Sequence, residues 1–326
     1  MMKRKFIVLF VALLLVFSAC SKKSEEVVVE EPKEKTNINF GILNGPTGIG
    51  SAYLLERNSN DESENHYEVS VSSDPSEVAS QLIASKLDIA ALPTNLAASL
   101  YNKTNGGIKV LALNTAGVLY ILENGSSINS FEDLNGKTIY ATGQGANPEY
   151  VLNYLLEQNN VEATVEFLDS AELVTRMTTG EIEVSMLPVP AVTTVLMKNE
   201  NVRIALDLTE QWDKLNNGSM LTMGCVVVRD EFLKENKEAV DLFLKEYEES
   251  INYVKENVSE AGSLCEKFAI VPNSAIASKA INDAHLIFVK GNDIKNTING
   301  YYEVLLNANP QSIGGNLPGD DFYIGE

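Results

Sequence analysis

Short apolar runs alternate with amphipathic stretches along most of the chain, and this alternation predicts an α/β protein. Ile38 to Leu43 is a continuous apolar run that is typical of a buried strand, and Asn44 to Gly50 follows it as a glycine-rich turn. A helical pattern begins at Ser51. A strand, a glycine turn and a helix in this order leave backbone N–H groups unpaired, so we expect this turn to hold a small polar ligand.

The same pattern occurs a second time. Thr138 to Thr142 is predicted as a strand, Gly143 to Pro148 as a turn and Glu149 to Gln158 as a helix. Each copy continues with an amphipathic helix and a strand that ends in proline. Four pairs of residues have the same separation along the chain: Gly48 and Gly143, Gly50 and Gly145, Glu77 and Glu172, Pro93 and Pro188. The repeat predicts two lobes that face each other across a cleft.

The remaining pattern supplies further strands and helices of the same kind. Strands are expected at 87–93, 109–113, 118–122, 182–188, 202–207 and 221–228, and helices at 75–86, 96–103, 171–180, 190–198, 230–257, 259–269, 274–284 and 292–306. We interpret the two strands at 109–122 and the strand at 221–228 as crossovers between lobes. Such alternation predicts mainly parallel sheets, in which ligands bind outside the carboxyl ends of the strands.

The turns at these strand ends hold the predicted ligand-binding residues. They are Asn44, Pro46, Thr47, Gly48, Thr94, Asn95, Gly143, Gln144, Gly145, Asn147 and Pro188. The alternative is that the glycines only permit tight turns and the prolines only end strands. Four aromatic residues, Tyr53, Tyr120, Tyr150 and Trp212, either stack on a planar ligand or pack in the core.

The amino-terminal segment has the pattern of an export signal. Lys3 to Lys5 is basic, and Phe6 to Phe17 is apolar but shorter than the roughly 20 residues of a membrane-spanning helix. Phe17 to Cys20 resembles a bacterial lipobox, which makes Cys20 the lipidated residue of a membrane anchor; an ordinary signal peptide is the alternative. Residues 21–36 are rich in Glu, Lys, Ser and Pro, and we interpret them as a flexible acidic linker.

Composition excludes several classes of function. The formal net charge of −20 argues against binding to nucleic acid, which needs clustered Lys and Arg. No P-loop, dinucleotide fingerprint, nucleophile elbow or zinc spacing occurs, so we expect no enzyme activity, no cofactor and no metal. His66 and His285 are interpreted as surface or structural residues. Cys225 and Cys265 either pair or, as we favour, form two separate buried thiols.

The predicted turns hold no charged side chain, and Arg176, Arg203 and Arg229 lie elsewhere in the sequence. This weakens the case for an anion held by arginine pairs, although helix starts still attract small anions. The solute is therefore expected to be neutral, aromatic or a small anion.

Several segments together carry a family resemblance: the lipobox, the acidic linker, Asn44 to Gly48, Leu87 to Asn95 and Ala141 to Gly145. Together they resemble the solute-binding lipoproteins of bacterial ABC importers, in the branch related to sulfonate, nitrate and thiamine-pyrimidine binding proteins. The cysteine-rich motif of the related thiamine-pyrimidine synthase is missing.

The resemblance implies a two-lobed type II periplasmic-binding fold with a two-strand hinge and a monomeric, lipid-anchored, extracytoplasmic protein. Its function would be to capture a small molecule by hinge closure and deliver it to a permease with its ATPase. The predicted divisions are a signal peptide (1–20), a linker (21–36), lobe I (37–117 and 226–326) and lobe II (118–225). An extracytoplasmic sensor or adhesin with the same fold but no transport is the alternative.

Overall fold

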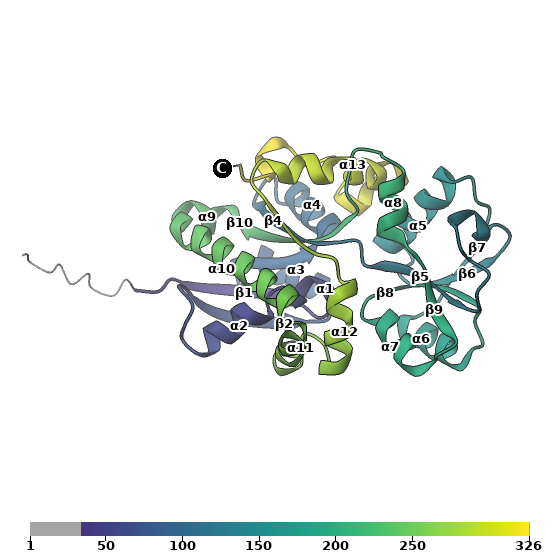
Figure 1. Ribbon diagram of the computed structural model, residues 1–326. Helices are drawn as coiled ribbons and strands as arrows, with labels where there is room; N and C mark the ends of the chain where they lie inside the picture. The colour runs from purple at the N-terminus through teal and green to yellow at the C-terminus, as the bar shows by residue number, and fades with distance from the viewer. Residues whose placement is uncertain (1–33, 326) are drawn as a thin grey trace, which may run out of the picture. The chain divides into compact units, whose positions relative to one another are not determined.

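Two separate mixed β-sheets and the helices packed on them make up the computed structural model, which describes residues 34–325 (Figure 1). The predicted signal peptide, Cys20 and most of the predicted linker lie outside the described residues. The six-stranded sheet has the order β11 (Leu286–Lys290), β4 (Ile108–Ala116), β10 (Thr222–Arg229), β3 (Ile89–Pro93), β1 (Asn37–Leu43) and β2 (His66–Ser72). The five-stranded sheet has the order β7 (Thr164–Phe167), β6 (Thr138–Ala141), β8 (Val184–Pro188), β5 (Leu119–Asn124) and β9 (Val202–Asp207).

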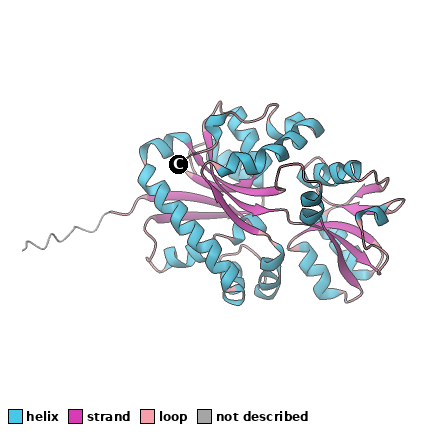
Figure 2. Ribbon diagram, turned by 45° about the horizontal axis from the view of Figure 1, so that its top comes forward, coloured by secondary structure: helices cyan, strands magenta, loops and turns pink. Residues whose placement is uncertain are grey.

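Helices lie on both faces of the strands, as the cyan and magenta elements of Figure 2 show. Residues 119–214 contain the five-stranded sheet and are called the five-stranded segment. The helices before and after this segment are α1 (Pro46–Ile49), α2 (Ala52–Ser59), α3 (Pro75–Ile83), α4 (Thr94–Lys103), α9 (Asp230–Glu235), α10 (Lys237–Glu256), α11 (Val258–Lys267), α12 (Ser274–Asp283) and α13 (Asp293–Ala308). Short 3₁₀ turns η2 (Pro310–Ile313) and η3 (Asp320–Phe322) follow them. Within the five-stranded segment lie η1 (Phe131–Leu134), α5 (Asn147–Gln158), α6 (Ser170–Thr179), α7 (Ala191–Lys198) and α8 (Leu208–Lys214).

The central strands are buried on both faces, which explains their continuous apolar runs. In β3, Ala90 and Leu92 pack in one hydrophobic cluster, while Ile89 and Ala91 pack in another on the opposite face. This alternation is the two-residue period of a strand, and a sheet covered on both sides needs apolar side chains at both phases. The burial predicted for Ile38 to Leu43 is confirmed, because all of these residues except Asn39 are buried in β1.

The chain crosses from the six-stranded to the five-stranded sheet at Gly117 and Val118, between β4 and β5, and it returns between α8 and β10. The interpretation of 221–228 as a crossover strand is wrong. β10 lies inside the six-stranded sheet and pairs antiparallel with β3 and β4 along its length. The chain is therefore already back in this sheet at Thr222, slightly before the predicted division at 226.

Three strands and two helices, α1 and α8, were not predicted from the sequence, and one predicted helix is divided. All three are edge strands: β2 and β7 are partly exposed and lack a continuous apolar run, whereas β11 contains the short apolar run Leu286 to Val289, which was not assigned as a strand from the sequence. The polar segment 208–218 contains α8, and the predicted helix 230–257 breaks at Asn236 into α9 and α10. The expectation of mainly parallel sheets is also wrong, because β5 and β10 run antiparallel to their neighbours.

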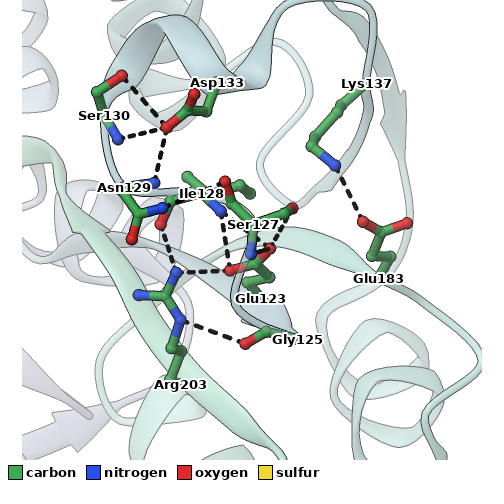
Figure 3. A network of polar contacts seen from close by, with 10 residues as sticks. All are labelled: Glu123, Gly125, Ser127, Ile128, Asn129, Ser130, Asp133, Lys137, Glu183 and Arg203. Carbon is green, nitrogen blue, oxygen red and sulfur yellow. Dashed lines mark hydrogen bonds and ion pairs between the residues drawn. The ribbon is translucent and has the colours of Figure 1, made fainter.

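A buried carboxylate stabilises the start of the five-stranded segment (Figure 3). Glu123 in β5 is fully buried, and its Oε1 accepts hydrogen bonds from the Ser127 N–H at 2.7 Å and the Ser127 hydroxyl at 2.6 Å. Its Oε2 lies 2.7 Å from Nη2 of Arg203 in β9. Burial raises the pKa of Glu123, but the hydrogen bonds from Ser127, Ile128 and Arg203 outweigh it and hold this pKa below its ordinary value.

We expect Glu123→Gln to lower the free energy of unfolding by about 1–3 kcal/mol at pH 7, because a buried charged hydrogen-bond network loses its anion. The folded-state pKa is lowered, so the stabilisation is present above the ordinary value of 4.5 and is lost as the pH falls below it. The difference between wild type and variant should therefore shrink in acid. Urea unfolding at several pH values measures this.

The matched control is Glu183→Gln, which removes the same charge from an exposed carboxylate that pairs with Lys137 at 3.0 Å (Figure 3). Exposed pairs contribute about 0–1 kcal/mol. Equal losses of stability in the two variants would contradict a special role for Glu123.

Candidate ligand-binding site

The first glycine turn follows β1, and several of its polar groups are hydrogen-bonded to carbonyl oxygens elsewhere in the chain. The N–H of Asn44 donates to the carbonyl oxygen of Ser72, and the N–H of Gly45 donates to that of Ile270, both at 2.9 Å. The Asn44 side chain donates to the carbonyl of Ala269. The expectation that the N–H groups of this turn point into empty space is therefore wrong for Asn44 and Gly45.

The two glycine turns match in a register different from the predicted one. Gly45 and Gly143 each lie two residues beyond a strand end and have φ values of 87° and 84°. Gly48 instead lies within α1, where an added Cβ would be 2.1 Å from the carbonyl oxygen of Leu43. The predicted pairing of Gly48 with Gly143 is wrong, and Gly48 is required by packing against the end of β1.

The predicted equivalence holds further along each copy. Asp74 and Asp169 both cap a helix, and each carboxylate accepts a hydrogen bond from the N–H two residues later at 2.8 Å. Pro93 and Pro188 both end a strand. The first copy therefore differs only at its turn, because one short helix, α1, is inserted before α2 while the second copy has the single helix α5.

The second glycine turn, Gly143 to Asn147, is more open. Gln144 and Gly145 are exposed, and a Cβ added to Gly145 would meet nothing within 4 Å. Asn147 is buried, and its Oδ1 has no hydrogen-bond partner among the described residues. The N–H of Gly145 donates to Oε2 of Glu149 at 2.5 Å. This turn therefore offers free polar atoms beside one carboxylate.

The turns after β3 and β8 are partly engaged in the fold. The buried hydroxyl of Thr94 donates to the carbonyl of Thr222 at 2.7 Å. The side-chain Nδ2 of Asn95 donates to the carbonyl of Ser312 at 3.4 Å. Pro188 pairs with Leu119 of β5. Pro46 is the first residue of α1, and Thr47 is half-buried with its carbonyl accepting from Asn114.

Two contacts bring turns of the two sheets together. A Cβ added to Gly45 would lie 3.9 Å from Cδ of Pro190, so the turn after β1 meets the turn after β8. The hydroxyl of Tyr150 in α5 donates to the carbonyl of Gly145 at 2.9 Å and accepts from Asn309 at 2.8 Å. Asn309 follows α13, so it ties the second glycine turn to the segment packed on α4.

His285 provides a third contact between elements of the two sheets, and although its sequence neighbours Ala284 and Leu286 offer it no polar partner, the fold brings polar groups to both ring nitrogens. The ring lies just before β11, where Nδ1 is 2.6 Å from the carbonyl oxygen of Gly117 and Nε2 is 3.3 Å from Oδ2 of Asp207. Thr209 of α8 lies 3.3 Å from Nδ1. His285, Asp207 and Thr209 line a cavity of about 340 Å³ next to the crossover. Of the two roles that the sequence left open, surface or structural, His285 has the structural one, beside the crossover between the sheets.

The arginines within residues 34–325 are all engaged with carboxylates. Arg203 pairs with Glu123 as described, and the shortest contacts of the others are 3.0 Å for Arg57 with Glu249, 3.6 Å for Arg176 with Glu172 and 2.8 Å for Arg229 with Asp88. None of them belongs to the turns of the candidate site.

The candidate aromatic residues have packing partners in the protein. Trp212 is fully buried between Tyr154 and Tyr301, and Tyr53 stacks on Tyr253 with ring centroids 3.7 Å apart. The hydroxyl of Tyr120 donates to the carbonyl of Asp283. The core alternative therefore accounts for these side chains.

The two cysteines are buried in the core, and the adjacent aspartates Asp320 and Asp321 form ion pairs with lysines. Cys225 and Cys265 are free and buried, which confirms two separate thiols, and burial raises the pKa of Cys265 to about 12. Asp321 and Asp320 pair with Lys109 and Lys295, each at 2.6 Å. The part of the chain that the structure describes contains no group of three or more His, Cys, Asp or Glu suited to a metal ion.

Comparison with known proteins decides the family. The family model described as NMT1/THI5 like matches residues 72–261, which is more than half of the chain. The chain belongs to the NMT1/THI5-like family. The resemblance noted from the sequence is thereby confirmed, while no curated protein sequence matches this NMT1/THI5-like chain.

Solved structures resemble this NMT1/THI5-like chain over nearly all of its length. An ABC transporter protein from Parabacteroides distasonis is 24% identical with a TM-score of 0.75, and the match covers 90% of this chain and 99% of the other. The periplasmic aliphatic sulphonate binding protein SsuA from Escherichia coli is 12% identical with a TM-score of 0.69, with coverages of 89% and 92%. A Candida albicans protein described as having the generic periplasmic binding protein fold is 14% identical with a TM-score of 0.56, with coverages of 88% and 92%. These likenesses confirm the fold.

We expect His285→Gln to lower the free energy of unfolding by about 1–3 kcal/mol, because the carbonyl of Gly117 loses its partner beside the crossover. Urea unfolding at pH 7 measures this. The control is His66→Gln, since His66 is half-exposed and lies 3.7 Å from the exposed Glu68. Comparable effects of the two substitutions would contradict a role for His285 in linking the two sheets.

Proposed function

We propose that this protein is an extracytoplasmic, lipid-anchored solute-binding protein of an ABC importer. Membership of the NMT1/THI5-like family and the fold shared with periplasmic binding proteins support this proposal. The observation that carries it is the meeting of the turns after β1 and β8, at Gly45 and Pro190, because these turns follow strand carboxyl ends of two different sheets.

The proposed mechanism is closure of two lobes around the solute. The sequence predicts residues 37–117 and 226–326 as lobe I and residues 118–225 as lobe II. Because β10 pairs with β4 from Thr222 onward, we propose that the chain returns to lobe I at Thr222. A ligand that contacts turns of both lobes binds the closed state more tightly and therefore shifts the equilibrium toward it. The closed protein would then be recognised by a permease that works with its ATPase.

The proposed binding residues are the predicted ones, and the structure distinguishes them by availability. Gln144 is exposed and the buried Oδ1 of Asn147 has no partner among the described residues, so these are the most available polar groups, while Thr47 is half-buried at the turn after β1. The N–H and the carbonyl of Gly145 are already bonded to Glu149 and Tyr150. Thr94 is the least available, because its hydroxyl is already bonded to Thr222. Binding without catalysis, as a monomer and without a cofactor, is the expected behaviour.

We expect Gln144→Ala and Thr47→Ala each to weaken solute binding by about tenfold, which corresponds to about 1.4 kcal/mol and to the loss of one hydrogen bond. Isothermal titration calorimetry of the full chain against a screen of small metabolites measures the affinity. Circular dichroism should show an unchanged fold. The control is Gln158→Ala, an exposed residue at the far end of α5.

Unchanged affinity in both Gln144→Ala and Thr47→Ala would remove these turns from the site. A folded protein that binds no solute of any class would contradict the proposed function itself.

The anchor is tested separately, because Cys20 lies outside the described residues. The structure contains no helix within residues 34–325 that is long and apolar enough to cross a membrane. We expect Cys20→Ser to move the protein from the membrane fraction to the soluble extracytoplasmic fraction, since several acyl chains are needed for lasting attachment. Cell fractionation with immunoblotting measures this, and retention of the variant in the membrane would contradict lipidation at Cys20.

A further inference from the structure

The second glycine turn carries a negative charge of its own at the place where an anionic ligand would bind. Glu149 lies in the first turn of α5, and its Oε2 accepts the N–H of Gly145 at 2.5 Å. The start of a helix and the N–H groups before it favour negative charge. In this protein the carboxylate of Glu149 occupies that position.

An incoming anion would therefore meet two obstacles at this turn. It would have to displace Glu149 from the N–H of Gly145, or it would have to bind next to the negative charge of the carboxylate. Like charges at close range cost binding free energy, whereas a neutral or positively charged group meets no such repulsion.

The turn after β1 does not compensate for this charge. The N–H groups of Asn44 and Gly45 already donate to carbonyl oxygens of Ser72 and Ile270. The turns at 44–50, 93–95, 143–148 and 188–190 contain no lysine or arginine. A fixed positive charge is therefore missing from every one of the turns proposed for the site.

Arginines elsewhere in residues 34–325 are not free to serve the site either. Arg203 is held by the buried Glu123 at 2.7 Å, and Arg229 is held by the buried Asp88 at 2.8 Å. Arg57 and Arg176 pair with carboxylates of their own surroundings. Recruitment of an arginine to an anion would leave a carboxylate unpaired, and for Glu123 and Asp88 that carboxylate is buried.

We propose that Glu149 is a specificity-determining residue that excludes anions, so that the solute is an uncharged or positively charged polar molecule. This inference rests on the proposed function, because it concerns the ligand of the same site. It separates this protein from a binder of sulfonates or carboxylates that shares its fold.

The test uses matched probes that differ in charge on one scaffold: benzoate, benzamide and benzamidinium. Each is titrated against the full chain by ligand-observed NMR at constant ionic strength, and sulfonate and sulfonamide pairs extend the set. We expect the neutral or cationic member to bind wild type at least about tenfold more tightly than the anionic member. Tighter or equal binding of the anionic member would overturn the inference and leave the proposed function standing.

The residue is tested by Glu149→Gln, whose amide oxygen can still accept from Gly145. We expect the affinity for the anion, relative to that for the neutral probe, to rise about tenfold in this variant. Glu149→Asp keeps the charge and should retain the wild-type preference. Circular dichroism and urea unfolding establish that the variants are folded.

The matched control is Glu157→Gln, which removes one negative charge from the same helix at an exposed position two turns away, roughly 12 Å along the axis. At this distance salt screens the charge, so the ratio should stay at the wild-type value. An equal change in Glu157→Gln and Glu149→Gln, or no change in Glu149→Gln, would overturn the role of Glu149. Failure of every probe and every screened solute to bind would instead contradict the proposed function.

Discussion

Burial of both faces of the central strands is the constraint on which the rest of this structure depends. β3 and β10 send alternate side chains into two different hydrophobic clusters, and β5 does the same with Leu119 and Tyr120 in the other sheet. Helices therefore cover both sides of each sheet, and polar groups are confined largely to the turns at the strand ends. The turns after β1, β3, β6 and β8 are thus the natural positions for recognition of a solute.

Hydrophobic packing and a few hydrogen bonds connect the elements of the two sheets. One hydrophobic cluster extends from β3 and β4 to β5, α5 and Trp212, while Ala280 of α12 packs with residues of α7. Polar contacts from Tyr150 and His285 lie at other points of the same boundary. Only two short segments of the described chain join the sheets, so the lobe closure that we propose would proceed through a change in these contacts.

Charge is distributed so that the arginines stabilise the fold and not the turns. Arg203 balances a fully buried glutamate, and Arg229 balances a buried aspartate at the start of β3. Removal of one partner leaves a buried charge uncompensated, and this costs more free energy than the intact pair contributes to stability. The arginines are therefore held at their carboxylates. The polar groups available to a ligand are consequently amides, hydroxyls and one carboxylate, and this limits the chemistry that the site can recognise.

Strong local patterns made much of the fold predictable from the sequence. The apolar runs of β1, β3 and β10 and the proline ends of β3 and β8 each depend on neighbours within a few residues. The edge strand β2 escaped prediction because polar residues interrupt its apolar pattern. The run Leu286 to Val289 of β11 escaped it because a short apolar run between two helices cannot be told from a buried helical segment by its pattern alone.

The sequence by itself thus determined the α/β class, the duplicated unit and the set of turns that hold polar residues. Only the tertiary structure decided that β10 runs antiparallel between β3 and β4, that Gly45 and not Gly48 corresponds to Gly143, and that His285 and Glu149 have the partners they do. The physical reason is that these features depend on sterics and hydrogen bonds, many of them between residues far apart along the chain, and residue patterns carry no record of such contacts.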